Sequence, residues 1–234
     1  MPVQGGFAWV RKDTRTGRDI KSGPGRTKAS VGCSSGMKIL AIILVVLLAL
    51  FIAFQIYTTV STARTEQQPY AVVTQRGALE IRHYPVSVLA TVEISDTAYQ
   101  SGSSSGFRRL AGYIFGANVR AEKIAMTAPV RMEKGASGMR MSFVMPGDRD
   151  TASLPAPRDP GVRLARSVDE HAAVLRFGGF LSDEVMVDRK QALLDAVGRE
   201  GLTVTGEVTY LGYDPPWQLV GRRNEVLVPV RWPD

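Results

Sequence analysis

The stretch FRRLAGYIF, residues 107–115, decides how the folded part of this chain is organised. Its apolar side chains recur at spacings i, i+3, i+4, i+7 and i+8, which place them on one face of an α-helix. They are Phe107, Leu110, Ala111, Ile114 and Phe115. A Gly/Ser stretch, residues 100–106, comes directly before them. We therefore expect an amphipathic helix that begins at Phe107.

The segments on both sides of this helix alternate apolar and polar residues, as half-buried strands do. Pro85 separates the first two strands from each other. The predicted strands of this half are 70–84 and 86–94 before the helix, and about 123–132 and 139–145 after it. A proline-rich connection then leads to a second half.

The second half repeats the same order of elements. Ser182 is a good N-cap residue before a helix from Asp183 to about Arg199, and Gly201 is a good stop. The predicted strands are 161–167, 171–178, 202–212 and 223–231. The order ββαββ therefore occurs twice. The fold class is α+β, with the two halves joined into one curved antiparallel sheet or open barrel that carries two helices and leaves a pocket for a ligand.

An unbroken apolar run, Ile39–Phe54, precedes the folded part. Three further residues extend it to the ~20 residues that a helix needs to cross a bilayer. We expect a single transmembrane helix over residues 37–58, with the lipid bilayer as its partner. The alternative is a signal peptide cleaved near Ala63, although the apolar region of such peptides is usually only ~7–15 residues long.

Most of the positive charge lies before this span. The first 38 residues contain eight of the 29 lysines and arginines and two of the 22 acidic residues, within a formal net charge of +7. The positive-inside rule then places the N-terminus in the cytoplasm and the C-terminal domain outside it, in a single-pass protein of the cell membrane. Met37 offers an alternative start that leaves the sign of this argument unchanged.

Composition divides the chain into four parts. We expect a basic disordered tail at 1–36, the membrane helix at 37–58, a linker at 59–68 and a folded domain at 69–234. Since the domain is close to neutral, we expect no nucleic-acid partner. The single cysteine, Cys33, lies in the tail and excludes a disulfide framework in the domain.

The folded domain contains few chemical motifs. It lacks a phosphate-binding glycine loop, a Gly-x-Ser-x-Gly elbow and a cysteine nucleophile, and its two histidines are His83 and His171. We therefore expect no enzyme. A hydrolase would need a carboxylate buried in the pocket, for which Glu122 and Glu225 are the residues to inspect.

Aromatic and basic residues lie together in two places. Alternation puts His83 on the apolar face of its strand with Leu79 and Ile81, as a core histidine or as an iron ligand. Arg108 and Arg109 flank the apolar face of the first helix. Before the last strand, aromatic residues stand next to paired arginines, which suits a flat ring with carboxylate arms. These residues are Tyr213, Trp217, Arg222 and Arg223.

Six stretches of the domain together resemble the SOUL, or haem-binding protein, family. They are EIRHYP (80–85), FRRLAGYIFG (107–116), KIAMTAPV (123–130), FVMP (143–146), YDPPW (213–217) and RRNEV (222–226). The resemblance covers about residues 70–232 and leaves out the tail and the membrane span. It implies a distorted antiparallel β-barrel with a pseudo-twofold repeat and two flanking helices.

The resemblance also implies a ligand, haem (heme b) or another tetrapyrrole, in a hydrophobic cleft between the first helix and the loop before the last strand. His83 occupies the place of a proposed axial iron ligand. The expected contacts are His83, Phe107, Arg108, Leu110, Ala111, Ile114, Met126, Tyr213, Trp217, Arg222 and Arg223. We therefore expect a membrane-anchored haem or porphyrin binder without enzymatic activity. The alternatives are a lipid-binding or amphipathic-ligand sensor without haem and, third, a hydrolase; protein partners stay open.

Overall fold

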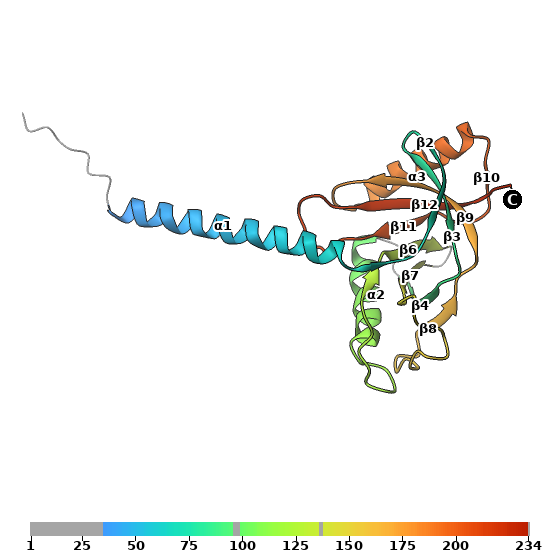
Figure 1. The fold of residues 1–234 in the computed structure, drawn as a ribbon, viewed down its shortest axis with the longest axis horizontal. Coiled ribbons are helices and arrows are strands. Elements are labelled where there is room, and N and C mark those ends of the chain that lie inside the picture. Colours follow the sequence, from blue (N-terminus) through green and yellow to red (C-terminus); the bar gives the residue numbers. More distant parts are fainter. Residues whose placement is uncertain (1–34, 96–98, 136–137, 234) are drawn as a thin grey trace, which may run out of the picture. The chain divides into compact units, whose positions relative to one another are not determined.

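A computed structural model describes residues 35–95, 99–135 and 138–233, and within them it has an α+β fold with three helices (Figure 1). The helices are α1 (Ser35–Ala63), α2 (Tyr99–Ile114) and α3 (Asp183–Arg199). The strands are β1 (Glu66–Gln67), β2 (Ala71–Arg76), β3 (Leu79–Tyr84), β4 (Val88–Ile94), β5 (Thr127–Ala128), β6 (Val130–Gly135), β7 (Gly138–Val144), β8 (Val162–Arg166), β9 (Glu170–Phe177), β10 (Thr203–Val204), β11 (Thr209–Gly212) and β12 (Asn224–Arg231).

The main sheet has ten strands and is antiparallel. Its order is β2-β3-β9-β12-β11-β6-β7-β4-β8, and β10 pairs with β12. Within the described residues β2 and β8 stand at the two ends and do not pair with each other, so the sheet is open. The predicted barrel is therefore wrong in its closure. After Pro85 the chain leaves β3 and enters β4, which pairs with β7 and β8 at the other end of the sheet.

The predicted repeat is present in the element order. The first half runs β3, β4, α2, β6, β7, and the second runs β8, β9, α3, β11, β12. Helix α2 packs on β4, β7 and β8, whereas α3 packs on β9, β10 and β12. Each half thus supplies one helix to the sheet, as the sequence pattern predicts.

Three predicted strands are divided in the structure. The predicted strand 70–84 is a hairpin of β2 and β3, because Gly77 turns the chain with φ +63°, a conformation that glycine adopts without steric cost. The predicted strand 123–132 becomes β5 and β6, and 202–212 becomes β10 and β11. Between β5 and β6 only Pro129 intervenes, after a cis peptide bond.

Helix α2 begins at Tyr99, eight residues before the predicted start. Gly106 explains how the Gly/Ser segment is held in the helix. A Cβ atom added there would lie 2.4 Å from Ile94 Cδ1 and 3.2 Å from Met141 Sδ, so a residue without a side chain lets the helix approach the sheet. Packing against the sheet thus outweighs the low helix propensity of glycine and serine.

Helix α3 agrees with its prediction. Ser182 is the N-cap and accepts a hydrogen bond from the backbone N–H of Val185. Asp183 and Glu184 occupy the first turn, where carboxylates stabilise a helix. Gly201 follows the C-cap with φ +67°.

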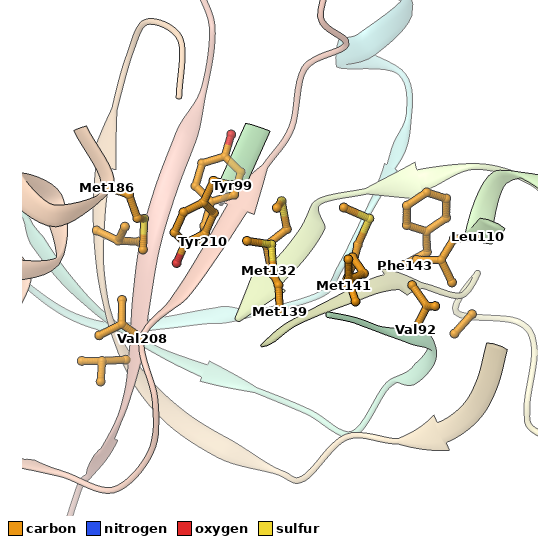
Figure 2. Close-up of a cluster of buried hydrophobic side chains, with 14 of the residues drawn as sticks. Val92, Tyr99, Leu110, Met132, Met139, Met141, Phe143, Met186, Val208 and Tyr210 are labelled. Atoms are coloured by element: carbon orange, nitrogen blue, oxygen red, sulfur yellow. The ribbon is translucent and has the colours of Figure 1, made fainter. Parts of the chain in front are cut away.

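The main hydrophobic core lies between the sheet and the two helices. Figure 2 shows that it runs from Leu110 and Phe143 at α2, through several methionines, to Met186 at α3. Leu79 and Ile81 of β3 belong to this core, whereas Tyr84 packs in a second, smaller core on the other face of the sheet. The predicted alternation along β3 is confirmed for Leu79, Ile81 and Tyr84, whereas His83 belongs to neither core and its side chain is 36 % exposed, so the expectation of a core histidine is wrong.

Helix α1 contains the apolar run and is long and apolar enough to cross a membrane. A signal sequence near an N-terminus can also meet these criteria of length and composition. Contacts along the chain separate residues 1–45 from residues 46–234. The predicted tail, residues 1–36, lies mostly outside the described residues.

Candidate functional site

Helix α2 and the residue after it expose apolar side chains along one side. Phe107 and Phe115 are 40 % and 57 % exposed, and Ala111 between them is half-buried. The spacing i, i+4, i+8 aligns these three residues, and the N–H of Phe115 continues the helical pattern by donating to the carbonyl of Ala111. The ring of Phe107 stands edge-on to Phe143, with centroids 5.2 Å apart.

The other half of the predicted apolar stripe faces inward. Leu110 and Ile114 are fully buried in the main core. A ligand therefore reaches them only if α2 separates from the sheet. The apolar stripe predicted from sequence therefore has two parts. Leu110 and Ile114 belong to the core, Phe107 and Phe115 are exposed, and Ala111 is half-buried.

The loop after α2 returns to the end of the helix and is tightly held. The side chain of buried Asn118 donates to the carbonyls of Tyr113 (3.0 Å) and Glu122 (2.7 Å) and accepts from the N–H of Glu122 (3.1 Å). The N–H of Ile124 donates to the carbonyl of Ile114, which holds the chain two residues before Met126 at this end of α2. Met126 is exposed. We call Phe107, Ala111, Phe115 and Met126 the α2 surface.

The basic residues near the α2 surface differ in their partners. Arg109 binds Asp159 through two hydrogen bonds of 2.7 and 2.8 Å, and this guanidinium lowers the pKa of the Asp159 carboxyl to about 2. Arg108 is exposed on α2. Lys123, also exposed, lines a hollow of about 250 Å³ that contains charges of both signs, with Ile124, Ala125, Pro146, Glu66, Asp148 and Arg149 as its other lining residues. Arg108 and Lys123 are therefore the cations that can meet an acidic ligand here.

The two arginines before β12 are used within the protein. Arg222 donates to the backbone carbonyls of Pro215 (2.7 Å), Gln218 (2.8 Å) and Asp214 (3.3 Å). Arg223 pairs with Glu225 at 2.8 Å and lies 3.8 Å above the ring of Tyr213. These guanidiniums close the loop and fill the interior, so binding of ligand carboxylates would compete with these contacts.

Tyr213 and Glu225 belong to a buried polar cluster. Arg82 and Glu225 are fully buried and form two hydrogen bonds of 2.7 and 3.1 Å, and the Tyr213 hydroxyl donates to Glu225 at 2.9 Å. Burial alone would raise the pKa of Glu225, but the hydrogen bonds and charges of Arg82 and Arg223 together lower it. The carboxylate is ionised and fully partnered. We call Arg82, Tyr84, Tyr213, Arg223 and Glu225 the Arg82–Glu225 cluster.

Neither carboxylate singled out for a hydrolase has the properties of a general acid. Glu225 is enclosed by its cluster, and Glu122 accepts hydrogen bonds from Arg149 and Arg120, which hold its pKa below the ordinary value. A general acid needs a pKa raised toward neutrality. Both groups instead serve as partners for arginines.

His83 lies apart from the α2 surface. Its Nε2 is 2.7 Å from Asp169 Oδ1, and its ring stands 5.0 Å from the ring of His171 on β9. Helix α2 packs mainly on β4, β7 and β8, whereas His83 lies on β3, the strand before β4 in the chain. In the described part of the chain, no three His, Cys, Asp or Glu side chains are grouped to hold a metal ion. The role of His83 as an iron ligand stays a prediction, and Nε2 would have to leave Asp169.

Sequence reasoning selected Phe107, Ala111 and Met126 for contact with a ligand but did not select Phe115. Its position at i+8 on the helix stripe was the available signal. The structure brings Tyr213, Trp217, Arg222 and Arg223 into one segment between β11 and β12, whereas the α2 surface forms a separate group.

Comparison with known proteins identifies the domain. The family model described as SOUL heme-binding protein matches residues 65–229. The chain belongs to this family. Heme-binding protein 2 of Mus musculus is 31 % identical over 160 residues, which are 65 % of this chain and 78 % of that protein. Heme-binding protein 2 of Homo sapiens is 29 % identical over the same shares.

One solved structure is similar to the SOUL domain in fold but not in sequence. The EcmrR C-terminal domain superposes with a TM-score of 0.52 at 12 % identity, covering 69 % of this chain and 98 % of that one. The family match begins after α1 and therefore says nothing about the membrane helix. At the level of the family, haem binding is supported for this SOUL domain.

Proposed function

We propose that this chain is a single-pass membrane protein whose SOUL domain lies outside the cytoplasm and binds haem, or another tetrapyrrole, on the α2 surface. Heme b is the first ligand to test. The observation that carries the proposal is the pair of exposed aromatic side chains, Phe107 and Phe115, on the first helix of a SOUL domain.

Apolar contact supplies the affinity in this proposal. A macrocycle laid on Phe107, Ala111, Phe115 and Met126 removes a few hundred Å² of apolar surface from water, which at ~25 cal/mol per Å² amounts to several kcal/mol before ordering costs. Ala111 provides a low point between two rings that a flat ligand can cover. The helix already rests on a packed core, so little of it must be ordered on binding.

Electrostatic contacts orient the ligand. Arg108 and Lys123 are exposed, whereas Arg109, Arg222 and Arg223 have carboxylate or carbonyl partners. We assign the propionates to Arg108 and Lys123. This differs from the expectation for Arg222 and Arg223, which the structure uses within the loop and the cluster.

A haemin titration tests the proposal. The full chain in phosphatidylcholine nanodiscs is titrated against empty nanodiscs, and a saturable shift of the Soret band is expected. Phe115→Asp should weaken the apparent affinity at least tenfold, whereas Phe180→Asp, a matched change of a phenylalanine that is 54 % exposed, should not. If Phe115→Asp and Phe180→Asp bind haemin with equal affinity, haem does not bind on the α2 surface.

His83 is tested separately. If its imidazole coordinates the iron, His83→Ala changes the Soret maximum and the spin state of the bound haem. If haem binds without this ligand, the spectrum of the variant equals that of the parent while Phe115→Asp still weakens binding. The two results distinguish loss of the ligand from loss of the site.

The native cysteine reports the orientation of the anchor. In intact cells an impermeant maleimide should leave Cys33 unmodified and should label a Thr151→Cys variant in the SOUL domain. Labelling of Cys33 alone would mean that the N-terminus lies outside the cell and the SOUL domain inside it, opposite to the proposal. A mature chain that begins after Ala63, as measured by mass spectrometry, would show that α1 is a cleaved signal sequence.

A second candidate function rests on a different cavity. A cleft of about 400 Å³ lies between the start of α2, α3 and the strands β6 and β11. It combines an apolar floor with two lysines and two carboxylates: Tyr99, Met186, Val187, Val208, Lys134, Lys190, Asp183 and Glu207. This combination suits a small amphipathic ligand without haem, and mass spectrometry of compounds extracted from the purified protein tests it.

A further inference from the structure

The loop between β11 and β12 exposes three large apolar side chains in close succession. Trp217, Leu219 and Val220 are 56 %, 49 % and 70 % exposed. Between the first two, Gln218 is buried. We call these three residues the Trp217 patch. A contiguous apolar patch on a loop indicates an interaction surface, because soluble surfaces rarely concentrate such side chains.

The loop that carries the patch is held in one conformation. Arg222 donates to three of its carbonyls, and the N–H of Gln218 donates to the carbonyl of Pro215. The guanidinium of Arg222 also lies 4.7 Å above the ring of Phe180. Internal hydrogen bonds therefore fix the loop while its three apolar side chains stay exposed.

The same loop is hydrogen-bonded to the C-terminal part of α1. Gln55 Nε2 donates to the carbonyl of Trp217 (3.2 Å), and the N–H of Leu219 donates to Gln55 Oε1 (3.0 Å). Two turns further, Thr62 donates to the side chain of Gln218 (3.3 Å). Gln55 is the first polar residue after the unbroken apolar run of α1. The Trp217 patch is thus attached at the level where this run ends.

We infer that the Trp217 patch inserts into the headgroup region of the bilayer that α1 spans. The inference rests on the proposed membrane anchor. An apolar run that fills the hydrocarbon core ends at the membrane interface, and tryptophan is enriched there because its ring is apolar while its N–H reaches water. Gln55 then links the helix and the loop at the same depth.

The anchor explains why a patch of three side chains suffices. A surface loop tethered to an inserted helix meets the bilayer at a high effective concentration, so it needs little affinity of its own. The SOUL domain is then held to the membrane at two points, α1 and the loop. Two attachments fix the orientation of the domain, whereas one flexible attachment does not.

Depth-dependent quenching tests the inference. The full chain carries three tryptophans, Trp9, Trp217 and Trp232. The variant with Trp9→Phe and Trp232→Phe retains Trp217, and the control with Trp9→Phe and Trp217→Phe retains Trp232. Both are reconstituted into nanodiscs of phosphatidylcholine and phosphatidylglycerol with a doxyl group at carbon 5 or carbon 12 of the acyl chain.

We expect Trp217 fluorescence to fall at least twofold with the carbon-5 label and less with the carbon-12 label, while Trp232 changes little. Gln55→Leu should reduce the difference between the two labels, because the loop loses both hydrogen bonds to Gln55 and keeps only the one from Thr62 to α1. The variant's far-ultraviolet circular dichroism must match the parent.

Two failures are distinguishable. If Trp217 is quenched no more than Trp232 while the chain resists carbonate extraction, the anchor stands and the docking of the loop is overturned. If carbonate extraction releases the chain, or α1 is absent from the mature protein, both the anchor and the docking are overturned.

Discussion

The α2 surface and the Arg82–Glu225 cluster depart from the usual distribution of side chains in opposite directions. The first exposes aromatic rings to solvent, and the second buries charges in the domain. Every charged group of the cluster has partners within 3.1 Å, so the cluster satisfies itself. The exposed rings of α2 lack such compensation on their outer side. The buried charges of the cluster therefore indicate a role in stability, whereas the exposed apolar side chains of the α2 surface indicate an interaction with a ligand.

The largest effect is expected in the Arg82–Glu225 cluster. Glu225→Ala leaves the Arg82 charge buried without its main partner, so we expect the free energy of unfolding to fall by about 3–5 kcal/mol. Denaturant titration of the full chain in detergent measures it. Glu93→Ala removes an exposed partner of Arg140 and serves as the control, with an expected loss of about 0–1 kcal/mol. Equal losses would mean that burial of the cluster has no energetic role.

A double substitution sharpens this half of the comparison. Arg82→Met together with Glu225→Leu replaces the buried pair by apolar side chains of similar size. We expect it to recover most of the stability that Glu225→Ala loses, because neither buried charge is left alone. If the double variant is as unstable as the single one, the remaining residues of the cluster depend on the pair for their own partners.

At the α2 surface we expect the reverse effect, a loss of binding without a loss of stability. Phe115→Ala should weaken haemin binding about five- to tenfold, in keeping with the removal of one aromatic contact worth about 1–1.5 kcal/mol. The free energy of unfolding should change by less than about 0.5 kcal/mol, since the ring is mostly exposed. Soret titration and denaturant unfolding of the same preparation measure both. If Phe115→Ala instead lowers the free energy of unfolding substantially, Phe115 contributes to the core.

The smallest effect concerns the ion pair that holds α2 to the loop before β8. The pKa of Asp159 is lowered to about 2 by Arg109, below its ordinary value of 3.8. The pair therefore adds stability above pH 4, and this contribution is lost as the pH falls from about 4 to 2. Asp159→Asn should be slightly less stable than the parent at pH 6, and the two should converge near pH 2. A constant difference across this range would contradict the assignment.

Much of the fold follows from local sequence patterns. Alternation identified most strands, and the Ser182 cap and Gly201 stop bounded α3. The start of α2 did not follow, because Gly106 gains its helical conformation from contact with Ile94 and Met141, which are distant in sequence. Gly77 likewise interrupts a strand without interrupting the alternation.

The candidate site was predictable only in part. The helix stripe identified Phe107 and Ala111, but the periodicity could not tell that Leu110 and Ile114 are buried. The hydrogen-bond partners of Arg222 and Glu225 also could not be predicted from the sequence. Arg222 binds carbonyls of its own loop, which carry no sequence signature, and Glu225 binds an arginine 143 residues earlier in the chain.

If the proposed anchor confines this protein to a membrane surface, the open ends of the sheet have a consequence. Two-dimensional confinement raises the rate at which copies meet, and unpaired strand edges can join one molecule's sheet to the next. Here β2 carries a bulge between Val72 and Thr74, and β8 presents Arg163 and Arg166. An irregular edge at one end and like charges at the other oppose such joining, so crowded copies are expected to stay separate.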